Sequence, residues 1–211
     1  MSQGTIELIR GPMFARKSTE LAKRMRDAKV FRVNFIVYNP AIDTRYGMGR
    51  ICNHDGDVLL NSIPVPDSIA LLNDVIKHPE VKLVGVDEAQ FFLDGKLPKV
   101  VQYVTQEMGI DMVLAGLPHD YRGEVFGPMG ELASIAHRVT NLTAICTHEL
   151  SDGKQCNSPA YFTQRFDGDG QPVSFDGPTV EIGGRERYTA RCADHWQVPG
   201  RPRIDIDTLL K

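Results

Sequence analysis

The chain has 211 residues, of which 24% are charged, and its formal net charge is −3. This length suits one domain, or one domain with a small appendage. The charge excludes the basic excess with which nucleic-acid-binding proteins neutralise phosphates. The N-terminus lacks the basic and apolar regions of a signal peptide, and no apolar run approaches a bilayer-spanning length, so we expect a cytoplasmic protein without membrane contact.

The first predicted elements are a strand, a loop and a helix. Apolar and β-favouring residues in TIELIR run into Gly11, and helix-favouring residues begin at Lys17. The loop GPMFARKST between them nearly matches the phosphate-binding pattern GxxxxGK[ST]. Arg16 stands where the pattern has glycine, and we expect it to be left-handed at a cost of about 1–2 kcal/mol. An ordinary strand-to-helix turn is the alternative interpretation.

Two further segments follow before the middle of the chain. VNFIVYN (33–39) predicts a buried strand, and the turn-rich segment 40–57 predicts a long loop. This loop holds Asp43 and Arg45, for which substrate contact and ordinary surface charge are both open. A helix is predicted within 67–78, where the apolar residues of one face are Ile69, Leu72, Val75 and Ile76.

The middle of the chain repeats the alternation of strand and helix. A core strand over 83–86 delivers Asp87 and Glu88, a helix is predicted over 97–109, and another core strand over 110–116 ends in a glycine-bearing loop. Paired carboxylates at a strand end can organise Mg²⁺ and accept a proton, although a solvated strand end is the alternative. The alternation predicts a mostly parallel, doubly wound α/β sheet that binds ligands at the carboxyl ends of its strands.

The composition changes after about residue 141. Helical periodicity disappears, and short β-like runs separated by DG, GG and SP sequences follow. We therefore predict an α/β domain over 1–141, a small β-rich module over 142–196, and a tail over 197–211 that docks or frays. A module of about 55 residues commonly needs a metal or a disulfide to stabilise it.

Cysteine spacing points to a metal in this module. Cys192 and His195 form a CxxH pair, and nine residues that could form a hairpin separate Cys146 from Cys156. Thiolates and imidazole in such a set suit structural zinc. His148 is a competing ligand, inert buried cysteines are the alternative, and Cys52 lies far away in the first domain.

In combination, these motifs resemble the thymidine kinases of the P-loop, zinc-containing type, also called type II. The resemblance rests on GPMFARKST, DTRYG, DEAQFF, GLPHDYRGEVFG, TAIC, AYFTQR and EIGGRERYTARC, in this order over roughly residues 4–196. It implies a RecA-like P-loop fold with a zinc-binding lasso and transfer of the γ-phosphoryl of ATP, with Mg²⁺, to the 5′-hydroxyl of thymidine. The preference between thymidine and deoxyuridine as substrate stays open.

The resemblance also implies site residues. Glu88 is the implied catalytic base, Ser18 and Asp87 organise Mg²⁺, and Arg45 neutralises charge near the 5′-oxygen. The implied ATP-binding residues are Gly11, Pro12, Met13, Phe14, Ala15, Arg16, Lys17, Ser18, Thr19, Asp87, Glu88, Ala89 and Gln90. The implied nucleoside-binding residues are Met13, Asp43, Arg45, Phe91, Leu117, Tyr121, Thr163, Val180, Glu181, Ile182, Gly183 and Tyr188. The implied zinc ligands are Cys146, Cys156, Cys192 and His195.

Two departures from the family pattern bear on function. Tyr121 replaces a common phenylalanine and brings a hydroxyl that needs a partner, whereas Arg16 replaces the loop glycine. A rival hypothesis is therefore a nucleoside- or nucleotide-binding protein whose kinase activity Arg16 has weakened or abolished. A zinc-stabilised structural protein is a third hypothesis, but it leaves Lys17, Asp87 and Glu88 without a purpose. The resemblance further suggests a homotetramer and feedback inhibition by thymidine triphosphate.

Overall fold

A computed structural model describes residues 2–43, 49–52, 57–181, 183–184, 186–203, 205–206 and 210. Its main part is a six-stranded sheet of order β5-β2-β6-β7-β1-β8, in which every neighbouring pair is parallel. The strands are β1 (Ile6–Arg10), β2 (Phe35–Pro40), β5 (Ile63–Val65), β6 (Leu83–Val86), β7 (Asp111–Gly116) and β8 (Arg138–Asn141). The expected parallel α/β sheet is confirmed.

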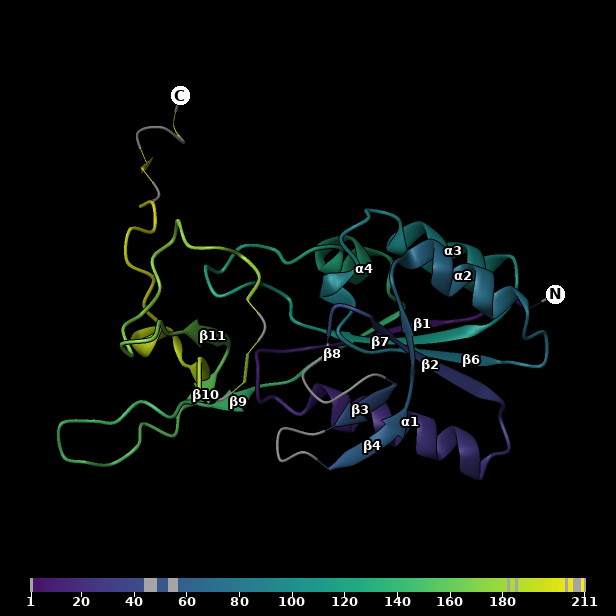
Figure 1. Cartoon of the computed structure of the whole chain (residues 1–211), viewed down its shortest axis with the longest axis horizontal. Helices are drawn as coiled ribbons and strands as arrows, with labels where there is room; N and C mark the ends of the chain where they lie inside the picture. Colours follow the sequence, from purple (N-terminus) through teal and green to yellow (C-terminus); the bar gives the residue numbers. More distant parts are fainter. Residues whose placement is uncertain are drawn as a thin grey trace.

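Helices cover both faces of this sheet (Figure 1). On one face lie α2 (Ser68–Ile76), α3 (Leu97–Gln106) and α4 (Met129–Ile135). On the other lie α1 (Lys17–Val30) and an antiparallel hairpin of β3 (Arg50–Cys52) and β4 (Val58–Asn61). A short 3₁₀ helix, η1 (Ala89–Phe91), follows β6. The strands are thus enclosed, as expected for a parallel sheet of apolar strands.

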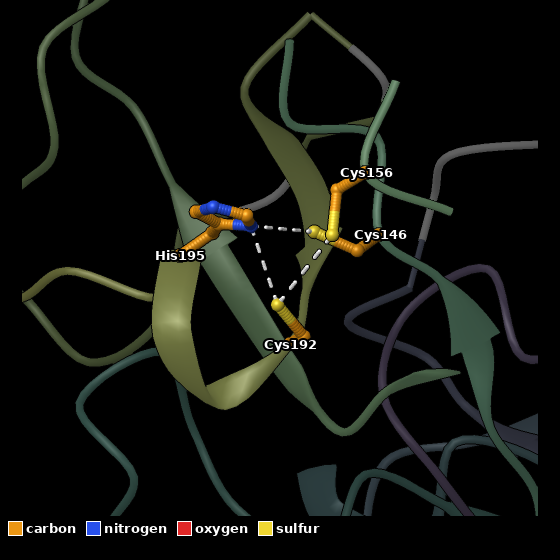
Figure 2. A group of neighbouring side chains, drawn as sticks. All are labelled: Cys146, Cys156, Cys192 and His195. Atoms are coloured by element: carbon orange, nitrogen blue, oxygen red, sulfur yellow. Dashed lines mark hydrogen bonds between the residues drawn. The ribbon is translucent and has the colours of Figure 1, made fainter. Parts of the chain in front are cut away.

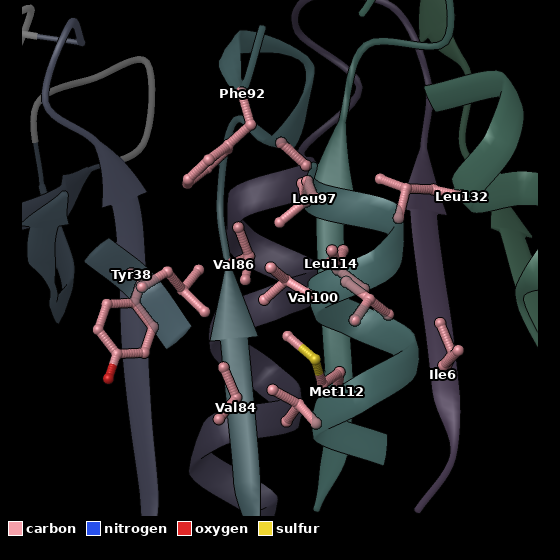
Figure 3. Packing of buried hydrophobic residues seen from close by; sticks show 14 of the residues in the cluster. Ile6, Tyr38, Val84, Val86, Phe92, Leu97, Val100, Met112, Leu114 and Leu132 are labelled. Atoms are coloured by element: carbon pink, nitrogen blue, oxygen red, sulfur yellow. The ribbon is translucent and has the colours of Figure 1, made fainter. Parts of the chain in front are cut away.

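The larger core lies between the sheet and helices α2, α3 and α4. Figure 3 shows Val86 and Leu114 of two central strands packed with Leu97 and Val100 of α3, and these side chains are almost fully buried. A smaller cluster on the opposite face joins Leu21 of α1 to the sheet and the β3–β4 hairpin. These two clusters hold the carboxyl ends of the strands in fixed positions, and the loops that follow them form the site.

Several elements differ from the sequence-based predictions. The segment expected as a long loop contains β3, because pairing with β4 decides its conformation rather than the turn-forming residues around it. The sequence pattern did not assign β4, β5, α4 or β8, which are short. In α2, Asp67 caps the helix through Ala70 N at 2.8 Å, but Ile69 and Ile76 of the expected buried face are 39% and 52% exposed. The inward face is formed by Leu71 together with Val75 of the expected face, and Leu72 of that face packs against the core.

The second module is built from very short antiparallel strands. β9 (Ala144–Ile145) pairs with β10 (Pro159–Ala160), and β11 (Phe162–Arg165) pairs with β12 (Tyr188–Arg191), which η2 (Ala193–His195) follows. The module lies beside the α/β domain, and a long hairpin projects from it (Figure 1). The change of architecture falls close to residue 141, although separate domains over 1–141 and 142–196 stay a prediction.

The beginning of the tail docks on this module. The side chain of Gln164 donates to Gln197 O and accepts from Gln197 N, both at 2.8 Å, and Phe175 N donates to Pro199 O at 2.8 Å. Among the described residues, none of the helices combines the length and apolar character needed to cross a bilayer.

Candidate active site

A pocket of about 490 Å³ opens at the carboxyl end of the sheet. Loops after β1, β2, β6 and β7 form its floor, and the second module forms its opposite wall. Of the sequence-predicted residues, those that line it are Met13, Phe14, Arg16, Lys17, Ser18, Thr19, Asp43, Asp87, Glu88, Phe91, Leu117, Tyr121, Thr163, Val180, Glu181, Gly183 and Tyr188. Segments far apart in the sequence thus meet around one cavity.

Other predicted residues do not line the pocket. Gly11, Pro12, Ala15, Ala89 and Gln90 are buried behind its wall. Close packing requires a glycine at position 11, because a Cβ atom there would lie 2.4 Å from Leu142 O. Arg45 and Ile182 lie outside the described residues.

The phosphate-binding loop has an alternating backbone. Phe14 and Arg16 have φ values of 66° and 62°, with Ala15 between them. Alternation of this kind turns successive N–H groups into one concave anion site. The left-handed conformation predicted for Arg16 is therefore present. Lys17 begins α1, is buried, and donates from Nζ to Pro12 O at 2.9 Å, which holds its ammonium group beneath the loop.

Asp87 and Glu88 follow β6 without continuing the strand. Glu88 has a φ of 50°, so the chain has already turned and the strand rule that sends neighbouring side chains to opposite faces no longer applies. Asp87 accepts from Glu88 N at 3.0 Å and from the hydroxyl of Ser18. Both carboxylates line the same pocket. The hydroxyl of Ser18 and the carboxylate of Asp87 provide oxygen atoms of the kind that Mg²⁺ prefers.

Burial makes Asp87 an unusual carboxylate. Loss of solvation raises its pKa to about 7, and the neighbouring charge of Glu88 acts in the same direction. The hydrogen bond from Ser18 and the charge of Lys17 oppose this rise. A divalent cation at this position would favour the ionised carboxylate, because a nearby positive charge stabilises the negative form.

Gln90 supports Glu88 from behind the pocket. Its side chain donates from Nε2 to Glu88 Oε2 at 2.5 Å and accepts from Leu117 N at 3.0 Å. Gln90 is fully buried, so these bonds join the ends of β6 and β7 through one amide. Gln90 was predicted to contact ATP, whereas its observed bonds go to Glu88 and to the backbone of Leu117.

The other end of the pocket is apolar. Met13, Leu117, Phe126 and Tyr188 form one buried cluster with Phe91 and Val180 against it. Met13 N also donates to Thr163 Oγ1 at 3.0 Å, which ties the phosphate loop to β11. Such a slot, with few placed polar groups, suits a flat neutral ring.

The hydroxyl of Tyr121 has the partner that it needs. It donates to Ser174 O at 2.8 Å, and this bond links the loop after β7 to the second module. The tyrosine that replaces the family's common phenylalanine is therefore satisfied in this structure.

Sequence reasoning missed several residues that line the pocket. These residues are Asn39, Ile42, Arg50, Ile51, Cys52, His119, Asp120, Phe126 and Thr179. Asn39 stands near the carboxyl end of a predicted strand, and His119 and Phe126 stand in a loop already assigned to the site, so their positions were available signals. Arg50, Ile51 and Cys52 belong to the unpredicted β3, for which the sequence offered none.

The four predicted zinc ligands meet in the second module. Their ligand atoms all lie within 4.8 Å of one another (Figure 2). Sulfur atoms of Cys156 and Cys192 are 3.9 Å apart, and His195 Nδ1 lies 3.7 Å from Cys146 Sγ and 3.3 Å from Cys192 Sγ. A tetrahedral zinc with ordinary bond lengths separates two sulfurs by about 3.8 Å and a sulfur from a nitrogen by about 3.6 Å. These side chains therefore fit a zinc ion.

The environment of the cluster supports metal binding. All the cysteines are free thiols, and the hydroxyl of Ser158 lowers the pKa of Cys156 to about 6, which favours the thiolate that binds metals. His148, the competing ligand, is not in the cluster but stacks on His195 with ring centroids 4.0 Å apart. The structure thus favours His195 as the ligand and gives His148 a packing role.

Comparisons with known proteins bear on the family of the chain. A family model described as thymidine kinase matches residues 4–196. A protein named thymidine kinase from Coprothermobacter proteolyticus is 41% identical over 198 residues, which cover 94% of this chain and 93% of that protein. The solved Pif1 helicase of Candida albicans is 12% identical, with a TM-score of 0.40, over 66% of this chain and 36% of its own.

Proposed function

This chain belongs to the thymidine kinase family and is a kinase that phosphorylates thymidine, and we propose that it transfers the γ-phosphoryl of ATP to the 5′-hydroxyl, forming thymidine monophosphate and ADP. One observation carries this proposal. A single pocket joins an anion-binding loop, two carboxylates and an apolar slot. A phosphate donor and a nucleoside can therefore meet in it with their reacting ends together.

The loop from Gly11 to Thr19 would hold the phosphates of ATP. Its backbone N–H groups and the start of α1 provide a positive potential, and Lys17 adds a charge close to the transferring group. Ser18 and Asp87 would bind Mg²⁺, which neutralises charge on the phosphates when it is bound with ATP.

Glu88 would act as the general base. Its carboxylate would accept the proton of the 5′-hydroxyl while the 5′-oxygen bonds to the γ-phosphorus and the bond from that phosphorus to the β-phosphate oxygen breaks. Gln90 would orient this carboxylate, since its amide bonds Glu88 on one side and Leu117 N on the other. Asp43 and Arg45 would contact the sugar near the 5′-oxygen.

The apolar end would hold the thymine base. Met13, Leu117 and Tyr188 would pack on the ring, and the backbone near Val180 and Glu181 would contact its polar edge. We also propose a structural zinc on the cysteine and histidine cluster, a cytoplasmic homotetramer and inhibition by thymidine triphosphate.

The rival hypothesis of lost activity gains no support from the family comparisons. Arg16 is strained in the left-handed region, but it lines the pocket, and a guanidinium group there could bind phosphate. Arg16→Gly should therefore change mainly the KM for ATP. Activity that appears only in Arg16→Gly, from a parent without turnover, would favour the rival.

The proposed function is tested by steady-state kinetics of Glu88→Gln in the metal-loaded protein. Loss of the base should lower kcat by about 10²–10⁴-fold while the Kd values for ATP and thymidine change little. Glu107→Gln, an exposed acidic residue at the end of α3, is the matched control and should behave like the parent. A folded, metal-loaded parent without turnover at high ATP would refute the proposal.

A further inference from the structure

Arg165 is a buried charge at the end of β11. It is 3% exposed, and a guanidinium in such a place requires partners that compensate its lost solvation. Its Nη1 donates to Pro178 O at 2.5 Å, and its Nη2 forms an ion pair with the carboxylate of Glu181. The guanidinium also lies 5.2 Å from the ring centre of Tyr121. One side chain therefore joins β11, the segment 178–181 and the loop after β7.

The segment that Arg165 reaches is held mainly by side-chain contacts among the described residues. We call residues 174–181 the arch, since this segment connects β11 to β12 across the pocket and contributes Thr179, Val180 and Glu181 to its wall. The arch has no regular secondary structure, and none of its residues is fully buried. A segment of this kind keeps one conformation only where specific side chains hold it.

Among the described residues, the other bonds to the arch lie at its two ends, near Ser174 and at Glu181, where Arg187 also forms an ion pair. Tyr121 bonds Ser174 O, Phe175 N bonds Pro199 O, and Tyr188 donates to Glu181 O at 2.6 Å. Arg165 alone among the described residues bonds both Pro178 and Glu181, the residues that flank Thr179 and Val180. The two bonds of its guanidinium group therefore fix the position of the part of the arch that faces the pocket.

We propose that Arg165 is a positioning residue for the nucleoside. It holds the arch in the conformation observed here, so that the backbone of residues 179–181 is already in place when the base binds. This proposal rests on the proposed function, because it assigns the base to this end of the pocket. Preorganisation of this kind increases affinity by removing the entropic cost of ordering the segment on binding.

Geometry distinguishes Arg165 from its neighbour Arg187. Glu181 also pairs with Arg187, but the side chain of Arg187 is 43% exposed. Among the described residues, the hydrogen bond to Pro178 O and the cation–ring pair with Tyr121 come from Arg165 and not from Arg187. Solvent weakens such a pair, whereas the buried fork of Arg165 is not screened. Arg187 therefore offers a matched control with the same side chain and the same carboxylate partner.

The test compares Arg165→Met, Arg165→Lys and Arg187→Met in the full-length, metal-loaded protein. We expect Arg165→Met to raise the KM for thymidine by at least about tenfold, with the KM for ATP and the metal content within about twofold of the parent. Arg165→Lys should have an intermediate effect, because a lysine is a point charge that cannot bond both partners at once. Arg187→Met should raise the KM for thymidine by less than about threefold.

A parallel rise in the KM for ATP, an unchanged KM for thymidine, or an equal effect of Arg187→Met would overturn the proposal. If Arg165→Met does not fold, Arg165→Lys decides the question by the same comparison of the two KM values. Thymidine binding can also be followed by the fluorescence of Trp196, the one tryptophan of the chain, whose Nε1 donates to Tyr121 O at 3.1 Å. A parent that does not phosphorylate thymidine refutes the proposed function, whereas an active parent with normal variants refutes only this role of Arg165.

Discussion

The two regions of the molecule are stabilised in different ways. The core of the α/β domain consists of large aliphatic side chains, such as Leu97 and Leu114, packed between a parallel sheet and three helices. Among the described residues, the buried members of the cluster in the second module are alanines and cysteines, together with Ala15 from the phosphate-binding loop. Small side chains bury little apolar area, so we expect the module to depend on its ion pairs, its stacked rings and the proposed metal site.

The two ends of the pocket are therefore supported in different ways. The phosphate-binding end of the pocket is formed by loops that follow strands of the large core. The apolar end is formed partly by segments of the second module, which are held by a few polar contacts and by the cysteine and histidine cluster. The regions are nevertheless coupled, because Phe14 and Ala15 pack against the cluster that includes Cys146 and Cys192. The cysteine and histidine cluster therefore packs against the phosphate-binding loop as well as against the module.

The largest effect should come from breaking the metal site. Cys192→Ser removes one ligand of the set, so we expect loss of the metal, disorder of the second module and a fall in kcat/KM of at least about 10²-fold. The helical signal of the α/β domain should persist. Metal analysis, circular dichroism and kinetics check this outcome.

Cys52→Ser is the matched control, since Cys52 lies in β3 outside the metal-binding set. It should retain one metal per chain. Simultaneous unfolding of both regions in Cys192→Ser would show that the large core does not stand independently of the module.

A cavity in the large core should have the next largest effect. Leu114→Ala should lower the free energy of unfolding of the α/β domain by about 2.7–5 kcal/mol, because Leu114 is fully buried among other apolar side chains. Metal content and kcat at low temperature should remain near those of the parent. Urea unfolding measures this loss of stability. Leu93→Ala is the control at an exposed leucine and should change the free energy of unfolding by less than about 0.5 kcal/mol. Loss of the metal in Leu114→Ala would contradict the separation of the two regions.

The pKa of Asp87 predicts a pH dependence at the phosphate end. In the folded protein this pKa is raised to about 7 from 3.8, so the folded state holds a proton that the unfolded state has lost between these values. Stability without ligand should therefore fall as pH rises from about 4 to 7. Asp87→Asn, which cannot ionise, should be more stable than the parent at pH 8 by about 1–3 kcal/mol and should show little gain at pH 4.

Urea unfolding at several pH values tests this dependence. The same variant should lose Mg²⁺-dependent turnover, because a neutral amide is a poor ligand for a hard cation. An equal stability difference between variant and parent at pH 4 and pH 8 would show that Asp87 does not titrate in this range.

The smallest effect should come from releasing the tail. Gln164→Leu removes two hydrogen bonds to the backbone of Gln197, and we expect a local cost of about 1–2 kcal/mol. Amide exchange at Gln197 should become faster, with little change in kcat. Gln171→Leu, at an exposed glutamine of the same module, should leave this exchange unchanged. Unaltered exchange in Gln164→Leu would mean that other contacts hold the tail.

Sequence patterns predicted the elements with long local signals. The strand, loop and helix around Gly11, the strand that delivers Asp87 and the helix that ends before Gly109 all have periodic or punctuated sequences, and the structure has each of them. The four zinc-type ligands were predicted because CxxH spacing and a thin module together restrict the possibilities. The strands β3 and β5, in contrast, have three residues each, and only their sheet partners give them a conformation.

By itself, the sequence determined the fold class, the order of the motifs and the residue types available for chemistry. These features depend on neighbours along the chain, since periodicity and turn formation are local properties. Tertiary structure decided that Gln90 supports Glu88 from behind the pocket, that the hydroxyl of Tyr121 finds Ser174, and that Arg165 reaches the arch. Each of these decisions depends on burial and on contacts between distant segments, which no local pattern specifies.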